Sequence, residues 1–500
     1  MNLPVRWIPH NYQCTAVSFL ISHPKSALFL DPGLGKTSIS LAATKILKYA
    51  QELSGVLLVA PLRVSYSVWP AEVAKWANFN NLSYTIIHDD NKGSIWGFKK
   101  DIYIINPEGL QWLHKELLRG LKLGRKCPFN ALIIDESTKF KSHDAQRFQY
   151  ICDMLPLFKR RHILTGTPSP RSLLDLWSQI YILDEGKALG ANYYEYRNKY
   201  FEAPDWNKYD WQLKDFCEEE IYARIAPLVL DMSAEDYLDM PELVFNDISV
   251  ILSEPAMKLY KKMERDMFIE LDGMEASAEA AAQMTMKCHQ IANGNVYEDV
   301  PLDLDEDEIK EFKKHRKTIY IHDAKIEALK DLIEELNGKP LLVGYHFKHD
   351  LEALRKALGK NIPYIGSGVS PKKSKELERA WNAGKLPLLF GHPDSMAHGL
   401  NLQDKGNDVC FYSLTPNLEL YIQFYRRIYR QGVAGNKVRV HHLVARNTVD
   451  EIFLSRLGER ADQQIDLRSA IREYRKLCSP SDIIVNKNTG HVVSPINIKL

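Results

Sequence analysis

Short apolar runs alternate with longer stretches of mixed polarity through the first 180 residues of the chain. Each run is strand-length and is followed by a turn, which predicts buried strands at residues 26–30, 56–60, 102–106, 131–134 and 162–165. The alternation returns near residue 339 and predicts strands at residues 340–345, 363–366, 386–391, 408–413 and 438–444. Strands separated by helix-length stretches are typical of parallel sheets with crossover helices, so the expected fold class is α/β.

The pattern changes between these two regions. Aromatic and charged residues dominate residues 193–222, an alanine- and glutamate-rich stretch at 275–282 predicts helix, and an acidic run at 298–311 predicts a solvated segment. Near the end, residues 462–476 predict a basic helix. Together these patterns predict a first lobe at 1–183, a mostly helical insertion at 184–323, a second lobe at 324–460, and a C-terminal helix and tail at 461–500.

Composition limits the classes of protein that fit. A chain of 500 residues predicts two or more domains, and its 45% hydrophobic and 26% charged residues are ordinary for a globular protein. The 65 Lys and Arg residues nearly equal the 64 Asp and Glu residues. A protein that coats nucleic acid with general positive charge is therefore excluded, and any nucleic-acid surface must be a local patch.

The seven cysteines are widely spaced and form no CxxC pair. Neither a zinc site nor a disulfide framework is expected from this spacing. The first residues lack the apolar core of a signal peptide, and no stretch approaches 18 consecutive apolar residues. We therefore expect no membrane association and a location in a reducing cytoplasm.

The strongest local signal is Asp-Pro-Gly-Leu-Gly-Lys-Thr at 31–37, between an apolar strand and a helical stretch at 38–49. Such a loop can wrap phosphates with backbone N–H groups, and Gly33 and Gly35 leave room for that approach. Lys36 can reach the β- and γ-phosphates and the Thr37 hydroxyl can bind Mg²⁺. The usual P-loop pattern has glycine where this chain has Leu30.

A second candidate for phosphate chemistry lies about 100 residues later, at the end of the apolar run 131–134. The strand delivers two adjacent carboxylates, Asp135 and Glu136, at its carboxyl end. Asp135 can hold Mg²⁺, and Glu136 can orient and deprotonate the attacking water. The pairing of this acidic strand end with a P-loop predicts ATP hydrolysis.

Further blocks follow in a fixed order along the chain. They are Pro-His-Asn-Tyr-Gln at 9–13, Val-Ala-Pro-Leu at 59–62, Trp-Pro-Ala-Glu at 69–72 with Lys-Trp at 75–76, Asn-Pro-Glu at 106–108, Leu-Thr-Gly-Thr-Pro at 164–168, His-Gly-Leu-Asn-Leu-Gln at 398–403, Gln-Phe-Tyr-Arg-Arg-Ile-Tyr-Arg-Gln-Gly at 423–432 and Thr-Val-Asp-Glu at 448–451. This order resembles superfamily 2 helicases and translocases, and among them the compact, stand-alone Swi/Snf-type DNA-dependent ATPases of bacteria and bacteriophages. The chain departs from that family at Thr138, where motif II usually has histidine, and at Arg426, where motif VI usually has glycine.

The resemblance implies two RecA-like lobes and roles for individual residues. Gln13 would contact the adenine of ATP. Arg427 and Arg430 would be arginine fingers supplied by the second lobe, with Gln423 orienting the water or the γ-phosphate. Their spacing of three residues would place both arginines on one face of a helix. An arginine finger is worth about 10³–10⁵ in rate in other nucleotide hydrolases.

Nucleic acid must contact both lobes if it is to be moved by their closure. The candidate contacts are Arg63, Asn106, Thr165, His346, Lys348 and Asn401. Most should touch phosphate or sugar, which gives affinity without reading sequence. For Thr165, hydrogen bonding at the end of a strand is an equal alternative.

The resemblance favours an ATP-dependent motor that translocates on double-stranded DNA and remodels DNA or protein–DNA complexes. A strand-separating or branch-migrating helicase is the alternative, with branched or single-stranded DNA as partner, but no separating pin is recognisable between residues 184 and 323. A catalytically dead binder is disfavoured because Lys36, Asp135 and Glu136 are intact. RNA remodelling is disfavoured by the Swi/Snf-type blocks. The expected cofactors are ATP and Mg²⁺, the protein partners stay open, and a monomeric state is compatible with the sequence.

Overall fold

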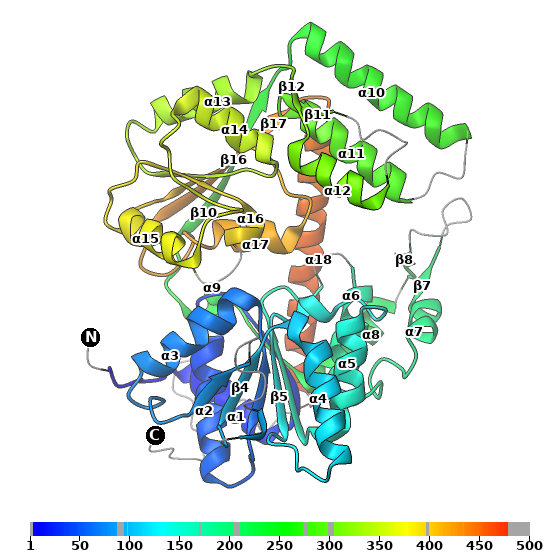
Figure 1. The fold of residues 1–500 in the computed structure, drawn as a ribbon, viewed down its shortest axis with the longest axis vertical. Helices are drawn as coiled ribbons and strands as arrows, with labels where there is room; N and C mark the ends of the chain where they lie inside the picture. The colour runs from blue at the N-terminus through cyan, green and yellow to red at the C-terminus, as the bar shows by residue number, and fades with distance from the viewer. Residues whose placement is uncertain are drawn as a thin grey trace. The chain divides into compact units, whose positions relative to one another are not determined.

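The computed structural model describes residues 4–87, 95–97, 99–169, 172–203, 211–215, 217–273, 278–298, 305–396, 400–433 and 435–478. The chain forms two compact units, each with its own parallel sheet (Figure 1). Unit 1 consists of Met1–Leu238 together with Arg460–Leu500, and unit 2 consists of Asp239–Glu459. The first unit is therefore assembled from both ends of the chain.

Unit 1 is built on a seven-stranded sheet in the order β3-β4-β2-β5-β6-β1-β9, in which all neighbours are parallel. Its strands are β1 (Lys25–Leu30), β2 (Val56–Val59), β3 (Tyr84–Ile86), β4 (Ile102–Ile105), β5 (Ala131–Asp135), β6 (Arg160–Thr165) and β9 (Val229–Met232). The inner strands are almost continuously buried, as expected of a parallel sheet covered on both faces. Because the strands are parallel, the loops that follow them share one edge of the sheet.

Helices cover this sheet and complete its core. They are α1 (Asn11–Ser22), α2 (Lys36–Tyr49), α3 (Trp69–Lys75), α4 (Leu110–Lys122), α5 (Gln146–Met154), α6 (Leu174–Asp184), α7 (Tyr193–Tyr200), α8 (Cys217–Ile225) and α9 (Ala234–Tyr237). One continuous cluster of buried residues includes Phe29 and Leu132 of the sheet and Leu113 and Leu176 of the helices. A small antiparallel pair, β7 (Phe201–Glu202) with β8 (Gln212–Leu213), follows α7.

Unit 2 is built on a six-stranded sheet in the order β10-β17-β16-β13-β15-β14, again with parallel neighbours. The strands are β10 (Glu242–Val250), β13 (Leu341–Gly344), β14 (Tyr364–Ile365), β15 (Leu388–Gly391), β16 (Asp408–Phe411) and β17 (Lys437–Ala445). Val343, Phe390 and Cys410 of the strands pack with Ile326 and Leu329 in the core of this unit.

The helices of unit 2 are α10 (Glu254–Gly273), α11 (Ala278–Ala292), α12 (Glu306–His315), α13 (Ala324–Glu335), α14 (Lys348–Leu358), α15 (Pro371–Asn382), α16 (Pro393–Met396) and α17 (Leu418–Tyr425). A short antiparallel pair, β11 (Asn295–Tyr297) with β12 (Thr318–Tyr320), follows α11. The last helix, α18 (Val449–Cys478), begins in unit 2 and ends in unit 1.

All ten strands predicted from the apolar runs are confirmed, to within about two residues at their ends. In the two parallel sheets, three strands were missed: β3, β9 and β10. The two short antiparallel pairs, β7 with β8 and β11 with β12, were also missed. The predicted basic helix at 462–476 is only the second part of α18. Parts of the predicted helix at 275–282 and of the acidic run at 298–311 lie outside the described residues, as does the tail after Cys478.

The α/β fold class with two parallel-sheet lobes is confirmed. The four-part division of the sequence stays a prediction, and the compact units group the same stretches differently. The stretch predicted as an insertion supplies β9 to the sheet of unit 1 and β10 to the sheet of unit 2. The middle of that stretch therefore pairs with both sheets.

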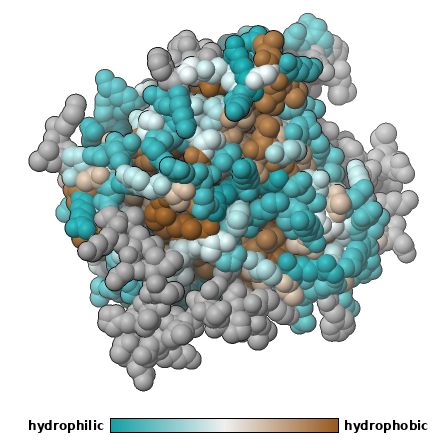
Figure 2. All heavy atoms as spheres, turned by 90° about the horizontal axis from the view of Figure 1, so that it is seen from below, coloured by the Kyte–Doolittle hydropathy of each residue, from teal (hydrophilic) through white to brown (hydrophobic). Residues whose placement is uncertain are grey.

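The surface is mainly polar where the figures show it. Figure 2 presents one face on which hydrophilic residues predominate and hydrophobic residues form separate areas among them. Within the described residues, no helix combines the length and the apolar character that a membrane crossing would need.

Candidate active site

The P-loop lies where the sequence predicts it, between β1 and α2 at the carboxyl edge of the sheet of unit 1. Gly33 and Gly35 both have positive φ, at 99° and 82°, which a residue with a side chain rarely adopts. Lys36 begins α2, and its Nζ donates to the carbonyl oxygen of Leu30 at 2.8 Å. Leu30 itself is fully buried at the end of β1, which explains why a side chain is tolerated where the P-loop pattern has glycine.

Gln13 packs directly against this loop. Its Nε2 donates to the carbonyl oxygen of Leu34 at 3.1 Å, while its Oε1 accepts from the backbone N–H of His10 at 3.0 Å. A Cβ added at Gly35 would lie 2.6 Å from Nε2 of Gln13, so no side chain fits there without displacing the amide. The two segments that the sequence assigns to nucleotide binding are thus in contact.

The two adjacent carboxylates lie at the end of β5 on the same edge. Asp135 is 8% exposed, and its Oδ2 accepts a hydrogen bond from Nε1 of the buried Trp69 at 2.8 Å. Burial raises the pKa of Asp135, although the Trp69 hydrogen bond and the nearby charge of Lys36 oppose that rise. Glu136 has a φ of 59°, a conformation that marks a sharp turn directly after the strand.

A buried amide joins the loop after β5 to the loop after β6. The hydroxyl of Ser137 donates to Oε1 of Gln179 at 2.6 Å, and Nε2 of Gln179 donates to the carbonyl oxygens of Pro168 at 2.7 Å and Asp175 at 2.8 Å. Ser137 and Gln179 are both fully buried. Since an unsatisfied buried amide is costly, Gln179 fixes the two loops relative to each other.

The two arginines proposed as fingers lie together in unit 2. Nη1 of Arg427 donates to the carbonyl oxygen of Leu400 at 3.1 Å, and Nη2 of Arg430 donates to the same oxygen at 3.4 Å. The prediction that they share a helix face is wrong, because α17 ends at Tyr425, after which Arg427 lies in a turn and Arg430 in a bend. The guanidinium groups converge through a shared acceptor instead. Burial lowers the pKa of Arg430 to about 10.

Gln423 lies in α17 beside these arginines, since its carbonyl oxygen accepts from Nε of Arg427 at 2.9 Å. Its Nε2 donates to Glu419 at 3.3 Å, while its Oε1 is buried without a hydrogen-bond partner among the described atoms. Most buried amide oxygens have a hydrogen-bond partner, so this one is unusual. The structure therefore groups Gln423 with Arg427 and Arg430, as the sequence predicts.

The nucleic-acid candidates of unit 1 follow the carboxyl ends of three strands. Arg63 is half-buried and immediately precedes a π-helical turn at Val64–Val68, and Asn106 follows β4 with its amide donating to Glu108 at 2.6 Å. Thr165 is fully buried at the end of β6, and its hydroxyl accepts from the backbone N–H of Thr167 at 3.1 Å. That geometry favours the alternative for Thr165, hydrogen bonding at a strand end.

The candidates of unit 2 differ in their exposure. Lys348 is exposed at the start of α14, whereas His346 is half-buried after β13 and burial lowers its pKa to about 4, so its imidazole is neutral at pH 7. The backbone N–H of Asn401 donates to Glu378 at 2.9 Å, and its side-chain Oδ1 is buried without a partner among the described atoms. Residues 398 and 399 of the same block lie outside the described residues.

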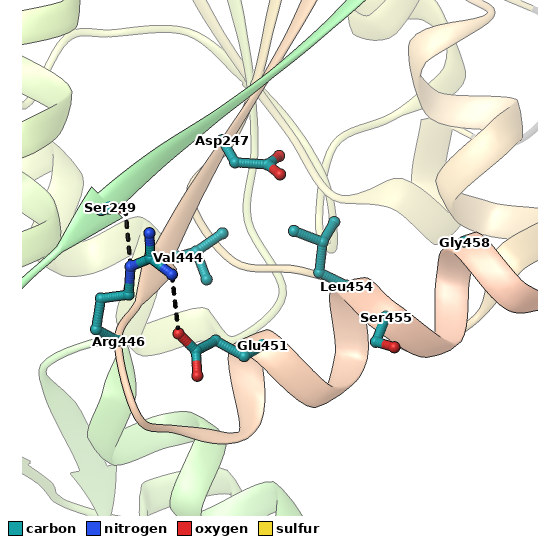
Figure 3. A pocket seen from close by; sticks show the side chains of 8 residues that line it. All are labelled: Asp247, Ser249, Val444, Arg446, Glu451, Leu454, Ser455 and Gly458. Carbon is teal, nitrogen blue, oxygen red and sulfur yellow. Dashed lines mark hydrogen bonds and ion pairs between the residues drawn. The ribbon is translucent and has the colours of Figure 1, made fainter.

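A separate hollow of about 410 Å³ in unit 2 is lined by β10, β17 and α18 (Figure 3). Arg446 donates there to Ser249 at 2.9 Å and pairs with Glu451 at 3.3 Å, and Asp247 pairs with His442 at 2.7 Å. Its charged groups are thus paired with protein groups. None of the lining residues is a candidate catalytic, nucleotide or nucleic-acid residue.

Comparison with known proteins decides the family. The sequence profile of the SNF2-related domain matches residues 12–295, more than half of the chain. The chain belongs to the SNF2-related family. It is accordingly a superfamily 2 DNA-dependent ATPase, and the profile of the helicase conserved C-terminal domain matches residues 324–432.

Relatives of this SNF2-related chain differ in length. Protein p41 of Acyrthosiphon pisum secondary endosymbiont phage 1 is 35% identical over 484 residues, covering 93% of this chain and 99% of that protein. The nuclear protein STH1/NPS1 of Saccharomyces cerevisiae is 23% identical over 498 residues, and there the match spans only 35% of the yeast protein. The Sulfolobus solfataricus SWI2/SNF2 ATPase core in complex with double-stranded DNA is 22% identical with a TM-score of 0.42, covering 95% of this chain and 98% of that one.

Two polar contacts of this SNF2-related site were missed in the sequence. Trp69 was noticed as part of a family block, but nothing in its neighbourhood pointed to Asp135, 66 residues away. Gln179 carries a local signal, because it is an amide within the apolar helical stretch Leu-Trp-Ser-Gln-Ile-Tyr-Ile-Leu at 176–183. A polar residue at a buried helical position must find a partner, and that rule could have singled it out.

Proposed function

We propose that this SNF2-related ATPase is a motor that translocates along double-stranded DNA and remodels DNA or protein–DNA complexes. The observation that carries the proposal is that the candidate catalytic groups are distributed over both units. Unit 1 places a P-loop and two carboxylates at one sheet edge, and unit 2 holds two converging guanidinium groups. Cyclic approach of such groups around ATP would convert hydrolysis into motion along a bound duplex.

Individual roles follow from the chemistry of each group. Lys36 would neutralise the β- and γ-phosphates, and the backbone around Gly33 and Gly35 would wrap them. Gln13 would contact the adenine from its position against the loop. Glu136 would accept the proton of the attacking water, and Gln423 with Arg427 and Arg430 would stabilise the charge of the transition state.

Magnesium fits the oxygen groups at this edge. Mg²⁺ prefers one or two protein oxygens and completes its octahedral shell with phosphates and water. The Thr37 hydroxyl at the start of α2 and the buried carboxylate of Asp135 provide such a pair, and a bound cation would offset the burial that raises the pKa of Asp135. The ion would neutralise phosphate charge. We propose that Thr37 and Asp135 hold it.

Trp69→Phe should weaken binding of the magnesium ion that ATP hydrolysis needs. The variant keeps the aromatic ring in the core but removes the N–H that fixes Oδ2 of Asp135. Groups that orient a metal-ligating side chain typically contribute about 10–100-fold in affinity or activity. We expect the Mg²⁺ concentration for half-maximal activity, and the Mn²⁺ dissociation constant measured by electron paramagnetic resonance, to rise about tenfold.

Trp76→Phe is the matched control. Nε1 of Trp76 donates to Glu72 at 2.6 Å, so the same substitution removes an indole hydrogen bond that does not involve Asp135. Its Mn²⁺ affinity should match the wild type. Equal Mn²⁺ affinity in Trp69→Phe and wild type would contradict the orienting role of Trp69.

Double-stranded DNA should stimulate ATP hydrolysis, and salt should reduce the stimulation. The proposed DNA contacts would bind mainly phosphate and sugar. They are Arg63, Asn106, His346, Lys348 and Asn401, with Thr165 as a weaker candidate. With only +1 net charge on the chain, attraction to DNA must come from such a local set. The logarithm of the affinity for DNA falls by about 0.9 per phosphate contact for each tenfold rise in salt concentration, so stimulation should decline steeply between about 50 and 200 mM salt.

The same assay separates the competing functions. Hydrolysis rates with duplex, single-stranded and forked DNA and with RNA are compared beside triplex displacement and strand unwinding. Duplex stimulation with triplex displacement and no unwinding is expected. Unwinding of forked DNA would indicate the helicase alternative, and equal hydrolysis with and without nucleic acid would remove the motor proposal.

We propose the cytoplasm as the site of action, or the host cytoplasm if the chain is phage-encoded. The phage relative that the chain covers almost entirely supports that context. Duplex DNA is the proposed partner, with branched and single-stranded DNA next. A monomer would suffice for the proposed mechanism, because both sets of catalytic groups are on one chain.

A further inference from the structure

The second part of α18 belongs to the core of unit 1. Leu467 and Ile471 are fully buried and join the apolar cluster of that unit. The start of the helix is anchored in unit 2 by Asp450, whose Oδ2 pairs with Nζ of Lys325 at 2.6 Å with both side chains fully buried. The helix that follows the arginine-bearing unit therefore ends inside the nucleotide-binding unit.

Arg468 of this helix reaches the first residue of the P-loop. Its Nη1 donates to Oδ1 of Asp31 at 2.6 Å, its Nε donates to Oδ1 of Asp231 at 2.5 Å, and its Nη2 donates to the carbonyl oxygen of Met232 at 2.8 Å. The side chain is 12% exposed. Burial alone would lower the pKa of Arg468, but Asp231 and Asp31 hold it above its ordinary value, so the charge is kept.

Asp31 transmits this contact into the loop. Its Oδ2 accepts from the backbone N–H of Ala234 at 3.0 Å, so both carboxylate oxygens are held. Its carbonyl oxygen accepts from the backbone N–H of Leu34 at 3.3 Å, which closes the turn of the P-loop. The carbonyl oxygen of Leu34 in turn accepts from Gln13 at 3.1 Å. A continuous hydrogen-bonded path thus runs from Arg468 to the glutamine of the nucleotide site.

We propose that Arg468 is a positioning residue for ATP binding, which holds the P-loop in its phosphate-binding turn through Asp31. A second effect acts in the same direction, since the guanidinium neutralises a carboxylate five residues before Lys36 that would otherwise repel phosphate. The inference rests on the proposed nucleotide role of the P-loop. It makes ATP affinity depend on a helix that enters unit 1 from unit 2.

Arg472 provides a matched control in the same helix. Its Nε donates to Oδ2 of Asp231 at 2.6 Å and its Nη1 donates to Asp236 at 2.8 Å, and neither of these contacts involves Asp31. The two arginines share Asp231 and differ in the contact with the loop. Substitution of either should lower the melting temperature, but only substitution of Arg468 should alter the nucleotide site.

The test measures the dissociation constant of a fluorescent non-hydrolysable ATP analogue and the melting temperature for Arg468→Gln and Arg472→Gln. We expect Arg468→Gln to raise the dissociation constant on the order of tenfold, a size typical of coupling between contacting groups, and Arg472→Gln to leave it unchanged. Arg468→Lys should recover part of the affinity because it restores the charge. Equal loss of affinity in the two glutamine variants, in step with melting temperature, would reduce Arg468 to a structural residue.

Asp31→Asn tests the path from the other end. It should weaken binding of the analogue, but by less than Arg468→Gln does, because it breaks the same link and also removes the carboxylate charge that would repel phosphate. The double variant should bind the analogue no more weakly than Arg468→Gln alone, because both changes break one link. If Arg468→Gln does not fold, unchanged affinity in Asp31→Asn overturns the proposal. Lys36→Ala tests the proposed nucleotide site separately from the role of Arg468. If Lys36→Ala bound the analogue with wild-type affinity, the nucleotide site itself would be refuted, whatever the Arg468 variants show.

Discussion

Glu136→Gln should strongly reduce the turnover of ATP while leaving ATP binding intact. The substitution keeps the size of the side chain in its strained position after β5 and removes the group proposed to accept the proton of the attacking water. General-base catalysis contributes about 10²–10⁴-fold, so the turnover number should fall by that factor. Measurement of single-turnover hydrolysis beside analogue affinity checks both parts of the expectation.

Lys36→Ala supplies the contrast. It removes the cation proposed to meet the phosphates, so binding and hydrolysis should be lost together, whereas Glu136→Gln should lose hydrolysis alone. A variant Glu136→Gln that keeps near-wild-type turnover would refute the assignment of the base. The pair of variants also shows whether a loss of activity comes from binding or from chemistry.

Arg427→Ala and Arg430→Ala should reduce turnover much more than ATP affinity. A charge that meets the γ-phosphate only in the transition state raises the rate without tightening ground-state binding. Arginine fingers are worth about 10³–10⁵ in rate, and a loss toward the lower end is expected if one arginine partly replaces the other at the shared acceptor Leu400. Turnover, analogue affinity and melting temperature should be measured on the same samples.

Arg456→Ala is the control for these variants, because Arg456 is exposed in α18 outside the proposed motifs. It should match the wild type in all three measurements. Arg427 is buried, so a purely structural role would lower the melting temperature and reduce activity only in proportion to the unfolded fraction. Wild-type turnover in both finger variants would remove the two-unit mechanism.

The sequence was informative where chemistry is local. The P-loop, its helix and the carboxylates after β5 are each encoded within a few residues, and their strands are short apolar runs that need no distant information. The order of the blocks then specified the family, which the SNF2-related match confirms. The individual roles of the site residues remain predictions, because sequence pattern and geometry are all that support them.

Long-range pairing was much harder to predict. Strand β9 carries Asp231 in its interior, so its pattern is broken, and the carboxylate is tolerated only because Arg468 and Arg472 meet it from α18. Strand β10 is exposed or half-buried at every residue except its last, and it pairs with β17 about 195 residues later. The contact between Arg468 and Asp31 spans 437 residues, a separation at which no local pattern carries a signal.

The division of unit 1 between the two ends of the chain affects how the protein is made. The stretch up to Leu238 is synthesised first. The ribosome must then synthesise all of unit 2 before Arg460 and the residues after it emerge. At about 5–20 residues per second, this interval lasts on the order of 10–40 s. Throughout it, Asp31 and Asp231 lack Arg468, and the apolar surface that Leu467 and Ile471 later cover is open to water. The nascent chain is therefore expected to need chaperone protection, and products terminated before α18 should aggregate.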